Sequence, residues 1–441
     1  MDKLPENPQT RDEEFGIQQR LEKPWLTPLS SSSPSSPTPE QVKIQFLQLT
    51  REQVHSRTFA LVLVLHAHLT NRSLALGDLQ YVARFFEWCD GDQLGKLAGE
   101  VEQIARQFVN SLKIPRLATQ AVGPLMLCVE KLVRGQLFLI TSVHVDVLQA
   151  SLLGKMYSAA EMFLERVVFA PQALRLELPV KRKMSTQTLA LDLHRFFYYA
   201  GVVYCGMEKF TQAQEQFVQC LALPTKATSA VQFEAYKKYV LVSLIAQGQV
   251  PGLPSYCSAV VHKSFGQAVG GQEGPSNAYS ALQQAFNNPE MDGQTLDRTS
   301  VGYRDEFMAS GNAGLVEQVQ LAYIKHRVIK LTDTYVTLGF TELQTQLGLQ
   351  EDMEPYLAKM IAKGEISAVL DQEMQVVRFL DQPVPHQVAK LQIELGKMQS
   401  LAGDLRDFDT RLSTSTKFVR GMTLGRNTAS KRGGSAMEDG N

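Results

Sequence analysis

The chain has 441 residues, of which 44% are apolar and 20% are charged, and its formal net charge is −1. These values are typical of an ordinary folded protein with room for two or three domains. A charge this close to zero produces no overall field that would draw the chain to nucleic acid or to an anionic membrane. The apolar run at 59–69 is shorter than the ~20 residues that a transmembrane helix needs.

The five cysteines are far apart in the sequence, and none of them forms a CxxC pair. This pattern predicts a reducing compartment in which cysteines serve as small core residues. Cys89, between Trp88 and Asp90, is a candidate nucleophile, but a cysteine on an apolar helical face is usually a core residue. The acidic N-terminus lacks an apolar core, so we expect neither a signal peptide nor a transit peptide.

Residues 1–40 predict a disordered arm, because the segment "LSSSSPSSPTPE" is rich in Ser and Pro and cannot bury a core. From there to about residue 330, apolar periodicity indicates mostly helices. We assign residues 41–207 to an N-terminal helical repeat region. Its first helical segments are expected at 41–69, 74–88, 94–113 and 120–134, and a loop is expected at 170–187.

The stretch "LVLVLHAHL" places His66 and His68 two residues apart, as in zinc peptidases that cut isopeptide bonds. On a helix, such residues point about 200° apart and cannot bind one ion. The apolar flanks favour a helix, and the serine and aspartate of the peptidase pattern are replaced by Leu76 and Leu79. Neither a Gly-rich phosphate loop nor a GxSxG elbow is present. We therefore expect no metal, no cofactor, no small-molecule substrate and no catalytic residue.

Residues 194–225 carry the pattern of a tetratricopeptide-like helical hairpin. Such hairpins need small residues where two helices cross and large ones that fill the gaps. The matching positions are Phe197, Gly201, Tyr204, Ala213 and Phe217. An earlier segment, 148–168, carries half of the pattern at Tyr157, Ala160 and Leu164. The alternative is any helical hairpin with a close Ala-Gly crossing. Stacked units of this kind form solenoids that usually bind protein partners.

The sequence pattern changes after residue 330, from long helical segments to short helices and strands. Two short helices are expected at 340–349 and 350–366, followed by two strands, "ISAVLD" and "QVVRFLD", around a turn at 371–373. This order predicts a winged helix at about 332–382, within a domain that covers 208–382.

A long helix is expected at 383–412, followed by a disordered tail at 413–441. Its apolar residues recur at spacings of three and four, at Val388, Leu391, Leu395, Met398, Ala402 and Leu405. Such a seam requires partner helices.

A winged helix raises the alternative of nucleic-acid binding. Between residues 315 and 382 there are six Lys and Arg residues against ten Asp and Glu residues, and the second helix begins with Glu351 and Asp352. A surface of that sign repels phosphates. We therefore interpret the wing as a protein-docking element, in which "QVVRFL" is an unpaired edge strand open to another chain.

A helical solenoid followed by a winged helix and a terminal helix resembles the PCI domain family, which is shared by subunits of the proteasome lid, the signalosome and a translation initiation complex. Within it, segments such as "MIAKGEISAVLDQEMQVVRFLD" resemble the third-subunit family of the COP-nine signalosome. The other such segments are 121–132, 144–161, 234–258 and 314–338. The resemblance covers about residues 45–400. It departs in the arm, the 170–187 loop and the tail.

The resemblance implies a non-catalytic scaffold subunit of the complex that removes the ubiquitin-like protein Nedd-eight from cullins and so regulates cullin-RING ubiquitin ligases. It implies contacts with other signalosome subunits, an indirect link to those ligases, and a location in cytoplasm and nucleus. A subunit of another PCI assembly and a nucleic-acid-binding protein are the alternatives. Carried onto this chain, the winged-helix edge residues are Val376, Val377 and Phe379, and the bundle residues are Leu391, Leu395, Met398 and Leu405.

Overall fold

The structure is a computed structural model that describes residues 9, 13, 46–69, 79–112, 114–133, 140–166, 186–266, 277–287, 293–347, 353–380 and 385–414. The predicted arm, apart from two isolated residues, the 170–187 loop up to residue 185 and the tail beyond residue 414 lie outside the described residues. The chain divides into two compact units, Met1–Tyr323 and Ile324–Asn441.

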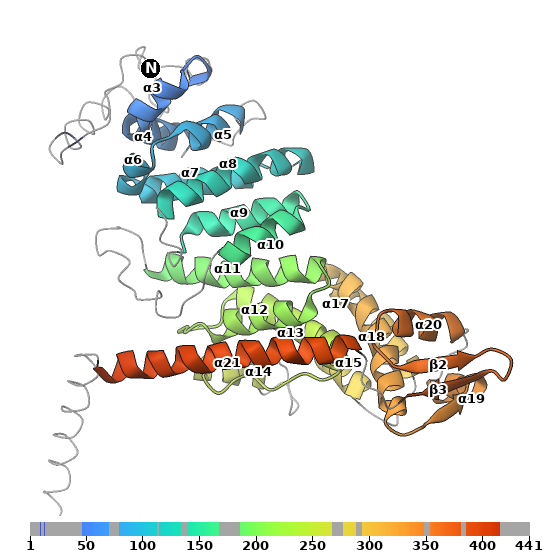
Figure 1. The fold of residues 1–441 in the computed structure, drawn as a ribbon. Coiled ribbons are helices and arrows are strands. Elements are labelled where there is room, and N and C mark those ends of the chain that lie inside the picture. The colour runs from blue at the N-terminus through green and yellow to red at the C-terminus, as the bar shows by residue number, and fades with distance from the viewer. Residues whose placement is uncertain are drawn as a thin grey trace, which may run out of the picture. The chain divides into compact units, whose positions relative to one another are not determined.

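In its described part, the first unit contains helices joined by turns and loops, and successive helices pack on one another (Figure 1). The prediction of a mainly helical repeat array is confirmed. Its helices are α3 (Arg51–Ser56), α4 (Thr58–Leu69), α5 (Leu79–Trp88), α6 (Gly91–Lys96), α7 (Ala98–Asn110), α8 (Pro115–Val133), α9 (Ser142–Leu153), α10 (Tyr157–Arg166), α11 (Thr186–Gly206), α12 (Phe210–Ala222), α13 (Ala230–Gln247), α14 (Ala259–Gly266), α15 (Asn277–Asn287), α16 (Gly293–Gly302), α17 (Arg304–Ala309) and α18 (Ala313–Thr332), which continues into the second unit.

Two of the predicted helices are each broken in two. The expected helix 41–69 is interrupted at Arg57, and the Thr58 hydroxyl beside the break accepts a hydrogen bond from the Asp90 backbone N–H at 2.9 Å. The expected helix 94–113 is preceded by α6, whose first turn is capped by the Asp90 carboxylate, and is interrupted at Leu97. The break at Leu97 has no side-chain cap, and there the Leu97 backbone N–H donates to the Leu94 carbonyl. An apolar pattern does not record such local breaks.

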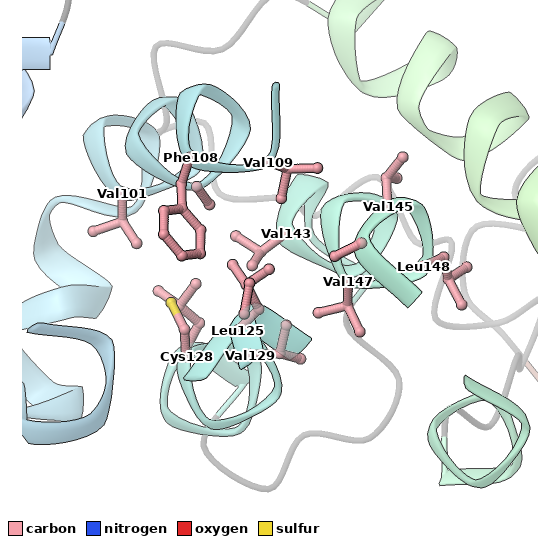
Figure 2. Packing of buried hydrophobic residues seen from close by; sticks show 14 of the residues in the cluster. Val101, Phe108, Val109, Leu125, Cys128, Val129, Val143, Val145, Val147 and Leu148 are labelled. Carbon is pink, nitrogen blue, oxygen red and sulfur yellow. The ribbon is translucent and has the colours of Figure 1, made fainter. Parts of the chain in front are cut away.

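The core of the first unit forms where α7, α8 and α9 meet (Figure 2). Phe108 from α7, Leu125 and Cys128 from α8, and Val143 from α9 are each at most 1% exposed and point toward one another. Apolar burial of this extent is the main stabilising contribution to such a stack. The apolar face of each hairpin is therefore completed by the next one.

The predicted tetratricopeptide-like hairpin is formed by α11 and α12. A Cβ atom on Gly201 would lie 2.6 Å from the Phe217 ring, and a Cβ on Gly206 would lie 2.6 Å from the Tyr157 ring. Only glycine permits these approaches, since real Cβ contacts are longer. The same geometry thus joins α11 to α12 on one side and to α10 on the other.

The second unit contains a winged helix, as predicted. Its elements are β1 (Thr337–Gly339), α19 (Phe340–Leu347), α20 (Glu354–Ala362), β2 (Ala368–Asp371) and β3 (Val376–Phe379), followed by α21 (Pro385–Thr414). The α20 helix ends at a left-handed Gly364, whose φ is 68°. Leu338, Leu343, Leu357 and Val377 are among the residues of a small separate core.

The three strands form one antiparallel sheet in the order β1-β3-β2. Leu338 lies opposite Val377 in the first pair, and Leu370 lies opposite Val377 in the second. β3 is therefore the central strand.

Candidate subunit interface

The structure corrects the prediction that β3 is an unpaired edge. β3 is hydrogen-bonded to β1 on one side and to β2 on the other. Val377 and Phe379 are 0% and 5% exposed, and Val376 is half-buried. Val377 and Phe379 therefore belong to the core of the winged helix, and the backbone groups of β3 are used within the sheet.

The open edge lies on β2 instead. The Leu380 N–H donates to the Ser367 carbonyl at 2.9 Å, which fixes the alternation of hydrogen-bonded pairs along β2 and β3. By this alternation, the N–H and C=O groups of Ala368 and Leu370 point away from β3. No hydrogen bond from the residues that the structure describes reaches these four groups. β2 can therefore accept a further strand.

The α21 helix carries the predicted seam on its surface. Leu391, Leu395, Met398 and Leu405 are 69%, 60%, 70% and 58% exposed. Every α21 side chain that the structure describes is exposed, and none of them belongs to a hydrophobic core. The helix is 30 residues long, or ~45 Å at 1.5 Å per residue. A fully exposed apolar seam of this length is unfavourable in water.

The apolar stripe of α21 is wider than the predicted seam. Leu401 and Phe408, which are 59% and 41% exposed, extend it on one side. At 3.6 residues per turn, the stripe from Phe408 to Leu395 covers roughly 140° of the helix surface. A stripe above ~100° is typical of a helix that packs in a core rather than in a two-stranded seam. The spacing of three and four residues predicts only the narrower seam, without Leu401 and Phe408.

The charge around the second winged-helix helix does not favour nucleic acid. The Lys325 ammonium forms an ion pair with Glu365 at 2.8 Å, and α20 begins at Glu354, which accepts a hydrogen bond from Gln372. Only Lys359 and Lys363 supply positive charge at the C-terminal end of α20. A helix with an acidic start and only these two lysines offers few of the donors that read base edges.

The histidine pair lies on a helix, as expected. His68 is 8% exposed, whereas the half-buried His66 bonds Gln103 through Nε2 at 2.5 Å. Among the described residues, no group of three or more His, Cys, Asp or Glu side chains could hold a metal ion. Within the same limits, no helix is long and apolar enough to span a bilayer.

Cys89 has the environment of a core thiol. It is 2% exposed, and burial raises its pKa to about 11 even though the Lys131 ammonium lies 3.7 Å from its sulfur. Lys131 is held there by the carbonyls at the end of α5, at 3.0 Å from Phe86 and 2.6 Å from Glu87. A nucleophilic cysteine requires an accessible thiolate, and Cys89 is neither accessible nor readily ionised.

Comparisons with known proteins agree with this architecture. A family described as COP9 signalosome complex subunit 3, N-terminal helical repeats, matches residues 41–261, and the PCI domain family matches residues 301–381. A protein from Arabidopsis thaliana named COP9 signalosome complex subunit 3 is 29% identical over 331 residues, which are 73% of this chain and 70% of that protein. A protein of the same name from Dictyostelium discoideum is 25% identical over 350 residues, covering 78% and 79% of the two chains.

The first match covers half of the chain and includes the stacked helices from α3 to α13. The second includes α17, α18 and the winged helix. The chain belongs to the COP9 signalosome complex subunit 3 family, and carries its helical repeats followed by a PCI domain.

Proposed function

We propose that this protein is a non-catalytic scaffold subunit of a COP9 signalosome, the complex that removes a ubiquitin-like protein from cullins. The observation that carries the proposal is α21. Its apolar stripe stays exposed over Leu391 to Phe408, and none of the three hydrophobic cores includes a described residue of this helix. A helix of this kind is stabilised when partner helices cover it. Family membership supports the choice of assembly.

The β2 edge supplies a second point of attachment. Ala368 and Leu370 direct unpaired backbone groups outward, so a neighbouring subunit can extend the sheet by one strand. In this role β2 replaces β3, whose own backbone groups are already paired. Backbone pairing gives attachment, and the side chains beside it give selectivity. The chain would thus be held at its sheet and at its terminal helix.

Catalysis would take place on another subunit. The candidate chemical groups of this chain are a buried thiol and a histidine pair on opposite sides of a helix, and neither forms a reactive constellation. The helical repeats provide the extended surface that such scaffolds use for binding. We further propose that the protein acts in both cytoplasm and nucleus, which fractionation of cells with a specific antibody would test.

The test uses the double variant Leu391→Asp, Leu395→Asp in the full chain. Leucines buried in an interface contribute about 2–5 kcal/mol each when truncated, and a buried charge costs more. We expect the variant to lose co-purification with the other subunits while its circular dichroism stays helical. The matched control is Gln392→Asp, Ser400→Asp, which places two charges on the face of α21 that lies away from the stripe.

Two outcomes would decide against the proposal. Normal assembly of the Leu391 and Leu395 variant would remove the role of α21, and equal loss with the control would show that charge alone disturbs the helix. Mass spectrometry of the proteins that co-purify with the native chain separates a signalosome from another PCI assembly. Retention on heparin with a steep salt dependence would instead favour nucleic-acid binding.

A further inference from the structure

The exposed apolar side chains of the winged helix are concentrated on its sheet. Of the large apolar residues described between 324 and 380, those that are exposed are Val336, Val369, Met374 and Leu380. All four lie on the strands, at their ends or in the turn between them, and none lies on α19 or α20. The sheet is therefore the part of the winged helix most suited to a further protein contact.

The side chains on the two faces of the sheet differ in exposure. Leu338, Val377 and Phe379 point inward and are at most 5% exposed. Because side chains alternate along a strand, Val369 and Leu380 point outward, and they are 54% and 43% exposed. The outward positions of a solvated antiparallel sheet are normally polar. Here the outer face carries Val369, Val376 and Leu380 beside Thr337, Arg378 and Asp371, so it is more apolar than a solvated face normally is.

A single cation lies in the middle of this outer face. Arg378 is on the central strand, directly opposite Thr337 on one side and Val369 on the other. It is exposed, and within the described parts of the chain its guanidinium has no ion pair and no hydrogen bond. The Asp371 carboxylate on the same face is already engaged, since its Oδ1 accepts the Met374 backbone N–H at 3.1 Å.

The size of the face determines what can cover it. Three strands about 4.8 Å apart span roughly 10 Å between the outer two, which is close to the ~10–12 Å diameter of one helix. Apolar side chains around Arg378 exclude water and so strengthen a pair between the guanidinium and a carboxylate. A phosphate backbone is a poor match, because Asp371 and Glu373 lie at the same end of the sheet.

We propose that the outer face of the sheet, formed by Val369, Val376, Arg378 and Leu380, binds one amphipathic helix of another polypeptide, and that this helix presents an Asp or Glu carboxylate to Arg378. The surface is separate from the β2 edge, because the edge uses backbone groups in the plane of the sheet. It also contains no residue of α21. The test below leaves both of those unchanged, so its failure would leave the proposed function standing.

The experiment places the photo-crosslinking residue p-benzoylphenylalanine at Val369 in the full chain and purifies the native complex through a tag on this chain. After irradiation, the crosslinked peptide is sequenced by mass spectrometry. We expect a peptide of another polypeptide, with apolar residues spaced by three and four and an acidic residue among them. The same crosslinker at Thr345, an exposed position on α19, serves as the control and should not capture this peptide.

Substitution of Arg378 tests the charge. Arg378→Gln should reduce the crosslink yield at position 369 about tenfold, since hydrogen bonds to charged groups are among the strongest. Arg378→Lys should retain part of the yield, because it keeps the charge but not the planar geometry. Arg378→Glu should abolish the crosslink, and a Lys in place of the captured carboxylate should restore it.

Three results would overturn the proposal. They are a crosslink to a second copy of this chain, a crosslink to an extended or basic segment, and a yield that Arg378→Gln leaves unchanged. Absence of any crosslink at position 369 in the assembled complex would also overturn it, because the face would then be open to solvent.

Discussion

The crossing of α11 and α12 can be tested by adding one methyl group at Gly201. A Cβ there would lie 2.6, 2.8 and 2.9 Å from three carbons of the Phe217 ring. Phe217 is 0% exposed, and its ring also lies 6.2 Å from that of Tyr198, so it has little room to move. Overpacking of a core costs about 1–3 kcal/mol. Alanine regains about 1 kcal/mol of helix propensity over glycine, so Gly201→Ala should destabilise the unit by up to ~2 kcal/mol.

A matched glycine gives the opposite expectation. Gly99 is the second residue of α7, and a Cβ built on it meets no atom within 4 Å. Gly99→Ala should therefore stabilise the protein through helix propensity alone, and by less than the ~1 kcal/mol of a helix interior because Gly99 lies in the first turn. Urea unfolding followed by circular dichroism, with the midpoint and slope of each transition compared, measures both effects.

A second substitution isolates the contact itself. In a Phe217→Leu background the ring edge is gone, so Gly201→Ala should lose most of its cost, and the two changes should be coupled in a double-mutant cycle. If Gly201→Ala were as stable as Gly99→Ala, the helices would have room to separate. The inference that α11 and α12 cross too closely for any residue but glycine at position 201 would then be wrong.

Two further expectations concern buried titratable groups of the first unit. Asp146 of α9 is 1% exposed, and its Oδ1 lies 3.3 Å from Nε of Arg106 on α7. Glu102 and Asp192 are also near. Burial raises the pKa of the Asp146 carboxyl to about 7. Since the folded state then keeps a proton that the unfolded state releases, stability should fall as the pH rises from 5 to 7.5, and Asp146→Asn should flatten that fall in urea titrations. Cys89, whose pKa burial raises to about 11, should resist alkylation at pH 8 in the folded protein and react fully in urea, as mass spectrometry of the labelled peptide would show; fast labelling of the folded chain would contradict its burial.

Local periodicity predicted the helices well, because each one buries a face whose spacing is visible in the sequence. Gly201 and Phe217 are two of the five positions that match the repeat pattern, and the structure brings them together where α11 and α12 cross. The exposed seam of α21 followed from the same type of pattern. In each case the determining interactions lie within one helix or one hairpin.

The sheet was predicted less well for a physical reason. The strands β2 and β3 and their turn were expected, but β1 was not, because three residues carry too little pattern to be recognised. β1 pairs with a strand about 40 residues later, and that pairing moves β3 from the edge to the centre. Strand order depends on such distant contacts, so Val377 was assigned to an interface when it lies in the core.

The helices of the first unit and the α21 helix differ in how they are stabilised. The first unit is self-sufficient, since the apolar faces of its hairpins are buried against one another, as Phe108 and Phe217 illustrate. The α21 helix has no such support, and Gly396 and Gly403 in its interior lower its intrinsic helix propensity by about 1 kcal/mol each relative to alanine. An exposed helix of this composition is marginal in water, because most helical stability in proteins comes from tertiary packing. Under the proposed function, formation of this helix is coupled to partner binding, so the free energy of association includes the cost of ordering the helix.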